Sequence, residues 1–545
     1  MFILKHLYKK HIFDFTLILI FIFITIKLTS YHFKVVTFPF QLEYRESVPL
    51  LITDALSKGI LPYNTNQLPY YSDLYGVVHP LITLPFTILL GNNLVTFKIV
   101  SLICIFFTCM LLFLNLKKNS KSVLSSIILT LLFYALSLFQ YTPICRSDAL
   151  GLLFFSISII YPFQNDFSIK SLICASFFSV LAFHTKIYFF IGFPIILSYL
   201  FLFASISKAL KSGMIYGLIF GITFLINSSL FDYYYIGTFH NQLASSSYEF
   251  AHMVKQTSYY FFSTLPVLTL FLVYSTIRYF ILNKDKYLNF FTITPHKINL
   301  TKHFNFKNGN SGVFADNFIS YWTYLFVCLL FILTFKMGGH NGNFLLYYIH
   351  LLSIPLIFLM NSFFNKYETI HKLIMGLVVL NILIVVKILP IKINENESVI
   401  KYKKIESIVK HSNMLLSNPI IGSIAFKEHK KVLNSGLTET FMIGEQFRYS
   451  GKMPKPLAMI KDKIYLKTIN KVLPINKKYI ESINYKIKTH AFDVVFTDTS
   501  IYDNWLINSK VLNQNGYLPI DTFDINMFAS YQNWRLICWR KSIKK

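Results

Sequence analysis

The apolar stretch FTLILIFIFITI, residues 15–26, is followed shortly by the charged stretch QLEYRESVPLL, residues 41–51. With its apolar neighbours, the first stretch approaches the about 18 nearly uncharged residues that are typical of a transmembrane helix. The second stretch places two carboxylates and a guanidinium just beyond that helix: Glu43, Glu46 and Arg45. The chain has 25 acidic residues against 52 lysines and arginines, so this acidic group at a membrane edge needs an explanation.

The composition predicts a polytopic membrane protein. Of the 545 residues, 54% are hydrophobic and only 14% are charged, whereas soluble domains are about one quarter charged. Further apolar runs occur at residues 126–139 and 373–389. The fold class that we expect is therefore α-helical, with many transmembrane helices.

The alternation of basic and non-basic loops predicts about eleven spans, since cytoplasmic loops are enriched in lysine and arginine. The N-terminus is expected in the cytoplasm, because it is basic and because no small-residue cleavage site follows the first apolar run. The expected spans are about 14–30, 94–116, 122–141, 148–163, 169–184, 187–205, 212–230, 257–282, 317–335, 343–361 and 373–390.

Two parts of the chain are predicted. Residues 1–392 form a transmembrane domain with a long outer loop at 31–93, and residues 393–545 form a small soluble α/β domain. Long domains cross membranes largely regardless of their charge, so this basic domain is expected outside the cytoplasm. Its predicted elements are a helix in YKKIESIVKHSNMLL (402–416) and strands in PIIGSIAF (419–426), FDVVFTD (492–498) and WRLICWR (534–540).

The formal charge of +27 does not indicate a nucleic-acid partner. The basic residues cluster in loops between spans, where they face anionic lipid. Most of the six cysteines lie inside apolar runs, and none forms a C-x-x-C pair. The sequence therefore predicts neither a structural zinc site nor a disulfide framework.

The predicted topology brings ionisable residues from five segments to the outer surface. Inside a span a charge costs about 2.5–3.5 kcal/mol, so such residues usually have a function. Carboxylates next to arginine and lysine suit chemistry on an anionic phosphate ester, because the cations hold the phosphate and a carboxylate takes a proton or holds a metal. The set is Glu43, Arg45, Glu46, Asp73, Arg146, Asp148, Lys186, Lys336 and His340.

Each of these residues also has an ordinary structural interpretation. Glu43 and Glu46 would share one helix face and could form a surface ion cluster. Arg146 and Asp148 could be an interfacial ion pair at a helix end. The long lysine side chains could reach the headgroups, and the histidine could be a polar loop residue; these are Lys186, Lys336 and His340. Their convergence on one face favours a functional site.

The stretch from Glu43 to Gly91 resembles the first outer loop of the GT-C membrane glycosyltransferases. An acidic pair follows the first span, and a G-x-x-x-Y step follows in GILPY, residues 59–63. CRSDALGLL (145–153) resembles their R-x-D-x-L element and FHTKIYF (183–189) their T-K-x segment. KMGGHNGNFLL (336–346) is similar to a late K-x-G-x-x-x-x-N-Y element.

This resemblance implies a transferase whose donor is a polyprenyl-phosphate-linked sugar, as in aminoarabinose transferases and protein O-mannosyltransferases. Glu43 and Glu46 occupy the acidic pair, and the other charged elements are matched by Arg146, Asp148, Lys186 and Lys336. Relatives often carry an acidic residue shortly after the late Asn–Tyr element. Here Asn343 is followed by Phe344 and, further on, by Tyr347, which leaves recognition of the acceptor open.

A sugar on a lipid phosphate is already activated, and neither a nucleotide nor a Rossmann loop is expected. Glu43 or Glu46 would be the general base, with the family position favouring Glu43, and the family implies inversion at the anomeric carbon. Arg146, Lys186 and Lys336 would neutralise the departing phosphate. A divalent metal held by the two glutamates stays open.

The predicted partners are the membrane lipid, the lipid-linked sugar and a glycan, lipid or protein acceptor. A transporter, flippase or polymerase that handles lipid-linked saccharides is the alternative, although it predicts charges deep in the spans and internal repeats. The expected location is a bacterial inner membrane, in cell-envelope glycan biosynthesis, with the C-terminal domain extracytoplasmic.

Overall fold

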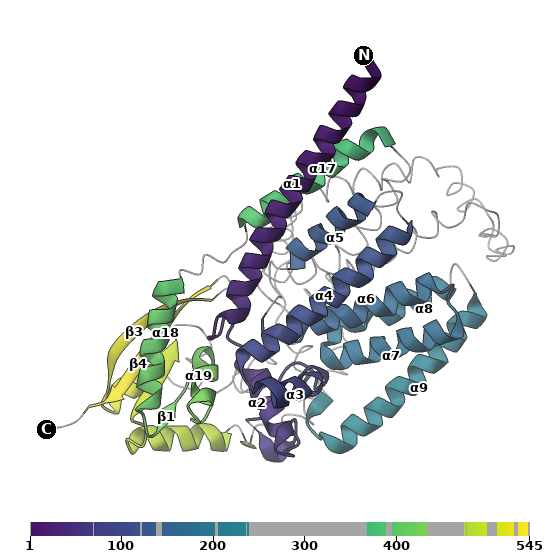
Figure 1. Ribbon diagram of the computed structural model, residues 1–545. Coiled ribbons are helices and arrows are strands. Elements are labelled where there is room, and N and C mark those ends of the chain that lie inside the picture. Colours follow the sequence, from purple (N-terminus) through teal and green to yellow (C-terminus); the bar gives the residue numbers. More distant parts are fainter. Residues whose placement is uncertain are drawn as a thin grey trace, which may run out of the picture.

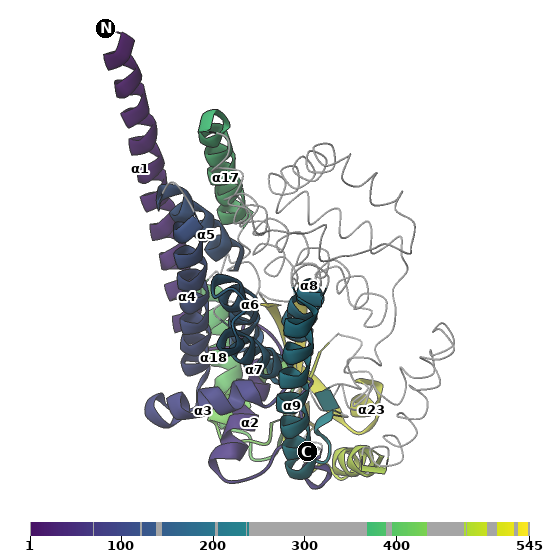
Figure 2. The ribbon, with the colours of Figure 1, turned by 90° about the vertical axis from the view of Figure 1, so that its right-hand side faces the viewer.

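The computed structural model of the chain describes most of both predicted parts. Figures 1 and 2 show a bundle of helices with a small sheet beside one end of it. The described residues are 2–68, 70–119, 123–137, 144–201, 205–235, 237–238, 368–388, 395–432, 474–475, 477–498, 509–527 and 532–542.

Three of the described helices are long and apolar enough to cross a membrane: α1 (Phe2–Thr37), α4 (Leu94–Asn119) and α9 (Ile206–Leu230). Helix α1 is longer than the predicted span at 14–30. The sequence has no proline or glycine before Pro39, so nothing ends the helix where its apolar run ends.

Shorter apolar helices lie where further spans are expected. They are α5 (Val123–Ser137), α6 (Asp148–Gln164), α7 (Ile169–Thr185), the 3-10 turn η2 (Ile187–Ile191) with α8 (Gly192–Tyr199), and α17 (Glu368–Ile388). The expected spans at 257–282, 317–335 and 343–361 lie outside the described residues. The chain is a multi-pass membrane protein, and the number of eleven spans stays a prediction.

The predicted outer loop 31–93 is itself partly helical. It contains the end of α1, followed by α2 (Ser47–Ser57), the short 3-10 turn η1 (Thr65–Gln67) and α3 (Val78–Leu90). Helix α2 packs against both α3 and the C-terminal part of the chain. The acidic stretch therefore lies between the long apolar helix α1 and the largely buried helix α2.

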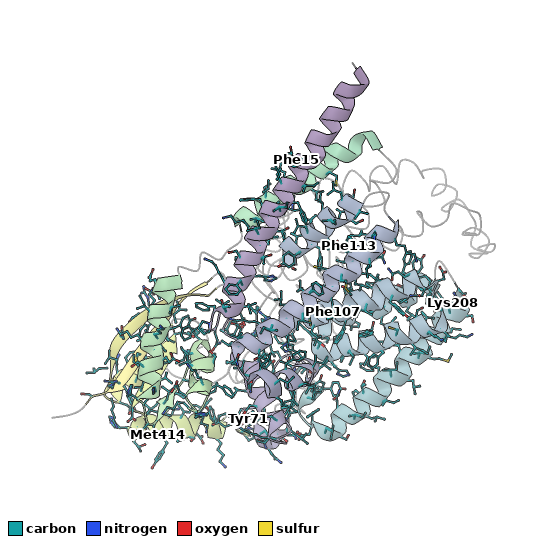
Figure 3. The ribbon with its side chains drawn as sticks, viewed as in Figure 1. Phe15, Tyr71, Phe107, Phe113, Lys208 and Met414 are labelled. Atoms are coloured by element: carbon teal, nitrogen blue, oxygen red, sulfur yellow. The ribbon has the colours of Figure 1, made fainter. Side chains whose placement is uncertain are left out.

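The bundle has an apolar core and an apolar exterior. Leu129, Phe133 and Phe155 are fully buried between α4, α5 and α6. Phe15 on α1 and Phe107 on α4 project outward, with 62% and 45% of their surface exposed (Figure 3). Large exposed apolar surfaces are typical of proteins in contact with lipid.

The C-terminal part contains a four-stranded sheet in the order β1-β2-β4-β3. The pair β1 and β2 is parallel, and the other pairs are antiparallel. Helix α18 (Glu395–Lys410) covers one face of the sheet, and a short helix α23 (Ser509–Gln514) precedes β3. The strands are β1 (Leu415–Leu416), β2 (Val494–Asp498), β3 (Tyr517–Met527) and β4 (Gln532–Lys541).

The predicted strands at 492–498 and 534–540 are confirmed as β2 and β4, and the predicted helix overlaps α18. The strand predicted at 419–426 is wrong: it forms a 3-10 turn, η6 (Pro419–Ile421), and helix α19 (Gly422–Lys427). The Asn418 side chain accepts a hydrogen bond from the Ile420 amide and Pro419 occupies the first position, which is a helix-starting arrangement.

The sheet shares an apolar core with the end of α1. Val35, Phe38 and Leu42 pack in one cluster with Ile405 of α18 and Val494 of β2. Figures 1 and 2 both place α18 beside the end of α1, and α19 contacts α2. The division of the chain at 392/393 into separate domains stays a prediction.

Gly76 fixes the segment before α3 against the end of α7. Its amide donates to the carbonyl oxygen of Thr185. A Cβ at Gly76 would lie 1.8 Å from the backbone oxygen of His184 and 2.7 Å from the hydroxyl of Tyr234. Because backbone atoms of a helix end cannot move aside without disturbing that helix, only glycine fits here.

Gly76→Ala should therefore destabilise the protein by about 1–3 kcal/mol or more, the usual cost of overpacking. Gly217→Ala is the matched control, because Gly217 lies on α9 and a Cβ added there would have nothing within 4 Å. Thermal unfolding in detergent measures both. Equal melting temperatures for the two variants would contradict this close contact.

Candidate active site

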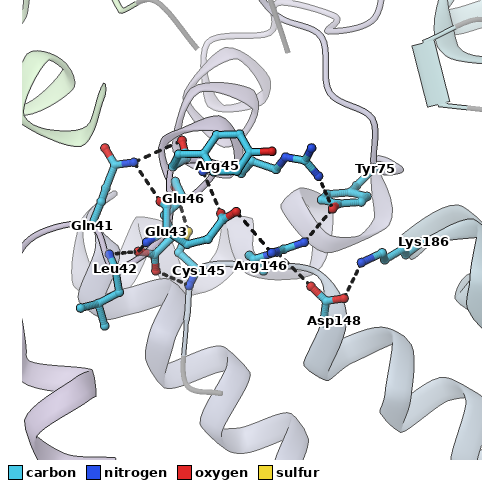
Figure 4. A network of polar contacts seen from close by, with 11 residues as sticks. Gln41, Leu42, Glu43, Arg45, Glu46, Tyr75, Cys145, Arg146, Asp148 and Lys186 are labelled. Carbon is cyan, nitrogen blue, oxygen red and sulfur yellow. Dashed lines mark hydrogen bonds and ion pairs between the residues drawn. The ribbon is translucent and has the colours of Figure 1, made fainter. Parts of the chain in front are cut away.

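A chain of buried ion pairs joins three elements. Glu43 Oε1 lies 3.4 Å from Arg146 Nη1, and Arg146 Nε lies 3.1 Å from Asp148 Oδ2. Lys186 Nζ donates to Asp148 Oδ1 over 2.6 Å (Figure 4). These four side chains are at most 4% exposed. The acidic stretch, the start of α6 and the end of α7 thus meet, as predicted for these residues.

Tyr75 connects this chain to Arg45. Its hydroxyl oxygen accepts hydrogen bonds from Arg45 Nη1 at 2.8 Å and from Arg146 Nη2 at 2.7 Å (Figure 4). Lys186 Nζ lies 4.6 Å from the centre of the tyrosine ring. Burial raises the pKa of Tyr75, so the hydroxyl keeps its proton at neutral pH. The hydroxyl thus accepts from both guanidinium groups and retains a proton of its own that it can donate.

Nothing in the sequence pattern distinguishes Tyr75. The chain has 35 tyrosines, whereas the acidic stretch and the arginine–aspartate element stand out by their unusual density of charge. Its place beside Lys186 follows from the fold, since the adjacent Gly76 packs closely against the end of α7.

Glu46 faces away from the ion chain. Its Oε1 accepts a hydrogen bond from the Cys145 amide at 2.8 Å, and its Oε2 accepts from the amides of Glu43, at 3.1 Å, and Leu42. Burial raises the pKa of Glu46, an effect that the charge of Lys98 opposes. The two glutamates therefore have different surroundings: Glu46 ties the acidic stretch to the segment before α6, whereas Glu43 meets arginine.

Lys98 is a buried cation that was not predicted as part of the site. It lies on α4, inside the predicted span, and its Nζ donates to the backbone oxygens of Phe38, at 2.8 Å, and Phe40, at 3.3 Å. It thus compensates the carbonyl groups just beyond the end of α1, where a cation is favourable. Its presence in a span was the available signal, since a lysine there is costly without a partner.

Asp73 is a fourth buried carboxyl group of this site, and the charges of Arg45 and Arg146 act on it. Burial raises its pKa from 3.8 to about 6, while the charge of Arg45 and the amides of Tyr75 and Leu74 oppose that rise. Asp73 and Arg45 belong to the set of ionisable residues predicted at the outer surface, and both lie beside Tyr75. Lys336, His340 and Asn343 lie outside the described residues.

A divalent metal does not fit the contacts of the two glutamates. Glu43 Oε2 accepts a hydrogen bond from the Arg45 amide at 2.8 Å, and Glu43 Oε1 faces Arg146. Both oxygens of Glu46 accept hydrogen bonds from backbone amides. Over the described ranges, no group of three or more potential ligands is present. Among the described residues, the carboxylates of Glu43 and Glu46 are therefore already engaged by a guanidinium group and by backbone amides.

The pH dependence of stability should report the burial of Asp73. The folded protein holds the Asp73 proton more tightly than the unfolded chain, so stability falls as pH rises from about 4 to about 6 and then stays constant. Linkage makes this loss on the order of 2–3 kcal/mol. Asp73→Asn cannot ionise and should avoid it.

The measurement is the melting temperature of Asp73→Asn and of the unmodified protein in detergent between pH 4 and 7.5. The melting temperature of the variant minus that of the unmodified protein should become more positive from pH 4 to pH 6.5. Above pH 6.5 this difference should stay constant. A difference that is constant across the whole range would contradict the raised pKa.

No protein-family model matches the chain, and no curated protein matches it. Among solved structures it is similar to ArnT from Cupriavidus metallidurans bound to undecaprenyl phosphate, with 8% identity, a TM-score of 0.52, and coverage of 96% of this chain and 98% of that chain. The same protein in the apo state aligns with 9% identity, a TM-score of 0.43, and coverage of 95% and 97%. The first likeness shows a shared fold and confirms, at that level, the predicted GT-C resemblance.

Proposed function

We propose that this chain, which has the fold of a GT-C glycosyltransferase, transfers a sugar from a polyprenyl-phosphate donor to a lipid, glycan or protein acceptor. The observation that carries the proposal is the buried chain from Glu43 through Arg146 and Asp148 to Lys186. The structurally similar ArnT was crystallised with undecaprenyl phosphate, which supports a polyprenyl phosphate as the donor lipid.

Glu43 is the proposed general base. It takes the proton of the acceptor hydroxyl as the acceptor oxygen bonds to the anomeric carbon, and the bond from that carbon to the phosphate oxygen breaks, leaving its electron pair on the phosphate. Attack from the opposite side inverts the anomeric centre. Glu46 is less suited to this role, because it faces away from the cations and three backbone amides donate to its oxygens. Glu43 accepts a hydrogen bond from one backbone amide, that of Arg45, and its other oxygen faces Arg146.

The phosphate is proposed to bind beside Tyr75. Arg146, Arg45 and Lys186 all lie around this ring, and its hydroxyl has one proton to donate after accepting two hydrogen bonds. A phosphate oxygen is a fitting third partner, because the charge on it grows as the sugar leaves. Within a pocket of low dielectric such donors contribute strongly to transition-state stabilisation.

The site is proposed to lie at the extracytoplasmic face of a bacterial inner membrane. Support comes from the distribution of basic residues: Lys117 and Lys118 end α4, and Lys208 and Lys211 begin α9. Figure 3 shows Lys208 at the end of the bundle away from Tyr71, which belongs to the predicted outer loop. Basic helix ends mark the cytoplasmic side.

Glu43→Gln should lower the turnover number by about 10²–10⁴-fold, the usual contribution of a general base. Membranes that hold the variant would be supplied with radiolabelled polyprenyl-phosphate sugars, and the label in lipid, glycan and protein fractions would be measured. Glu46→Gln is the matched comparison: because it affects the fold, it should lower the amount of folded protein more than the turnover of each folded molecule.

Normal transfer by Glu43→Gln would contradict the assignment of the base. Movement of labelled lipid across the membrane without any transfer, by the unmodified protein, would contradict the enzymatic proposal and favour a flippase.

Tyr75→Phe tests the phosphate position separately. It removes only the hydroxyl, so it should lower turnover by about 10²–10³-fold, as loss of one donor to a developing charge does elsewhere, and weaken binding of undecaprenyl phosphate. Tyr71→Phe is the control, as a partly buried tyrosine of the same loop. Unchanged affinity and turnover in Tyr75→Phe would place the phosphate elsewhere.

A further inference from the structure

The C-terminal part of the chain holds the acidic stretch through the side chain of Gln41. Gln41 Nε2 donates to the backbone oxygens of Glu43, at 3.2 Å, and Pro419, at 3.1 Å. Its Oε1 accepts from the Ser423 amide at 2.7 Å. One buried amide group therefore joins the backbone of the proposed base to η6 and α19.

Two further contacts reinforce this junction. The rings of Phe40 and Tyr402 stack with centres 4.7 Å apart and planes 9° apart, and the Tyr402 hydroxyl donates to the backbone oxygen of Gln41 over 2.9 Å. At Gly422 a Cβ would lie 2.4 Å from Ser47 Oγ. Helix α19 is thus packed closely against the start of α2, directly after the acidic stretch.

The stretch needs these contacts because residues 38–46 form neither helix nor strand. Buried backbone groups need hydrogen-bond partners, and in such a segment few of them come from regular backbone pairing. Side chains supply several of the partners here. Lys98 of α4 donates to backbone carbonyl groups of the stretch, and Glu46 accepts hydrogen bonds from its amides. Gln41 donates to a carbonyl group of the stretch and to one of the C-terminal part. The last of these supports links the stretch to a segment almost 400 positions away in the sequence.

We propose that the C-terminal part is a positioning element for Glu43, acting through Gln41. It fixes the backbone on which Glu43 faces Arg146, so that the carboxylate and the phosphate-binding cations keep their relative position. This role rests on the proposed function in so far as Glu43 is the base. It differs from simple capping of the bundle, since it couples residues 395–432 to turnover.

The test uses Gln41→Met, which keeps the length of the side chain and removes its amide, and Gly422→Ala. Both variants should lower the turnover number by 10–100-fold, because a displacement of about 1 Å at a catalytic group can cost about 10²-fold. The Michaelis constant for the lipid donor should change less than about threefold, since the contacts of Gln41 run to the acidic stretch and to α19 rather than to Tyr75 or Lys186.

Trp539→Phe is the matched control. It removes a buried hydrogen bond from Trp539 Nε1 to Thr497 Oγ1, 2.8 Å long, within the sheet. It should lower the melting temperature while leaving the turnover of folded enzyme unchanged. If Gln41→Met behaves like Trp539→Phe, the C-terminal part only contributes to folding and the proposal is wrong.

A double-mutant cycle identifies the residue through which the effect acts. In a Glu43→Gln background, Gln41→Met should cause little additional loss, because the base is already absent. A full additional 10–100-fold loss would show that Gln41 acts through another group and would overturn the proposal. A donor Michaelis constant that rises in proportion to the loss would do so as well.

Hydrogen exchange separates this inference from the proposed function. In Gln41→Met the amides of Leu42 and Glu43, which bond to Glu46, should exchange at least tenfold faster, and in Trp539→Phe they should not. If the unmodified protein transfers no sugar, the proposed function fails, yet faster exchange still supports the positioning contact. Unchanged exchange rates overturn the contact whether or not transfer is observed.

Discussion

Arg146 between Glu43 and Asp148 is the interaction on which the rest of the site depends. A buried charge is tolerated only when an opposite charge and hydrogen bonds compensate it, and removal of one partner from such a pair typically costs about 3–5 kcal/mol. Arg146 meets one carboxylate from the acidic stretch and one from α6, and Asp148 in turn meets Lys186 at the end of α7. The need to pair these charges therefore holds three distant segments together at one end of the helical bundle.

The acidic pair divides its tasks. Glu46 is fully buried and accepts hydrogen bonds from backbone amides, so it fixes the backbone of the acidic stretch. Glu43 instead faces the cations. The surrounding backbone is irregular and is paired by side chains from α4, from the stretch itself and from the C-terminal part. The proposed base lies on irregular backbone, whose position depends on such contacts. The positioning role that we propose for the C-terminal part follows from this dependence.

Much of this arrangement could be predicted from the sequence, because hydropathy and charge carry it. The positions of α4, α6 and α7 follow from apolar runs bounded by charge, and the meeting of Glu43, Arg146, Asp148 and Lys186 follows from placing them on one side of the membrane. Tyr75 and Gln41 could not be predicted, because neither residue type is unusual and each acts through a contact distant in sequence. The prediction of a strand at 419–426 was wrong because the Asn–Pro capping signal outweighed the β-rich composition of that segment. Strand β3 was not predicted because Pro519 and a bulge interrupt its alternating pattern.

The most direct test of the central claim is an experimental structure of the protein with undecaprenyl phosphate. We expect the phosphate to lie within about 3 Å of the Tyr75 hydroxyl and of at least one of Arg146 and Lys186, with the Glu43 carboxylate on the side open to an acceptor. A phosphate bound away from Tyr75, with the chain from Glu43 to Lys186 closed and out of its reach, would contradict the claim.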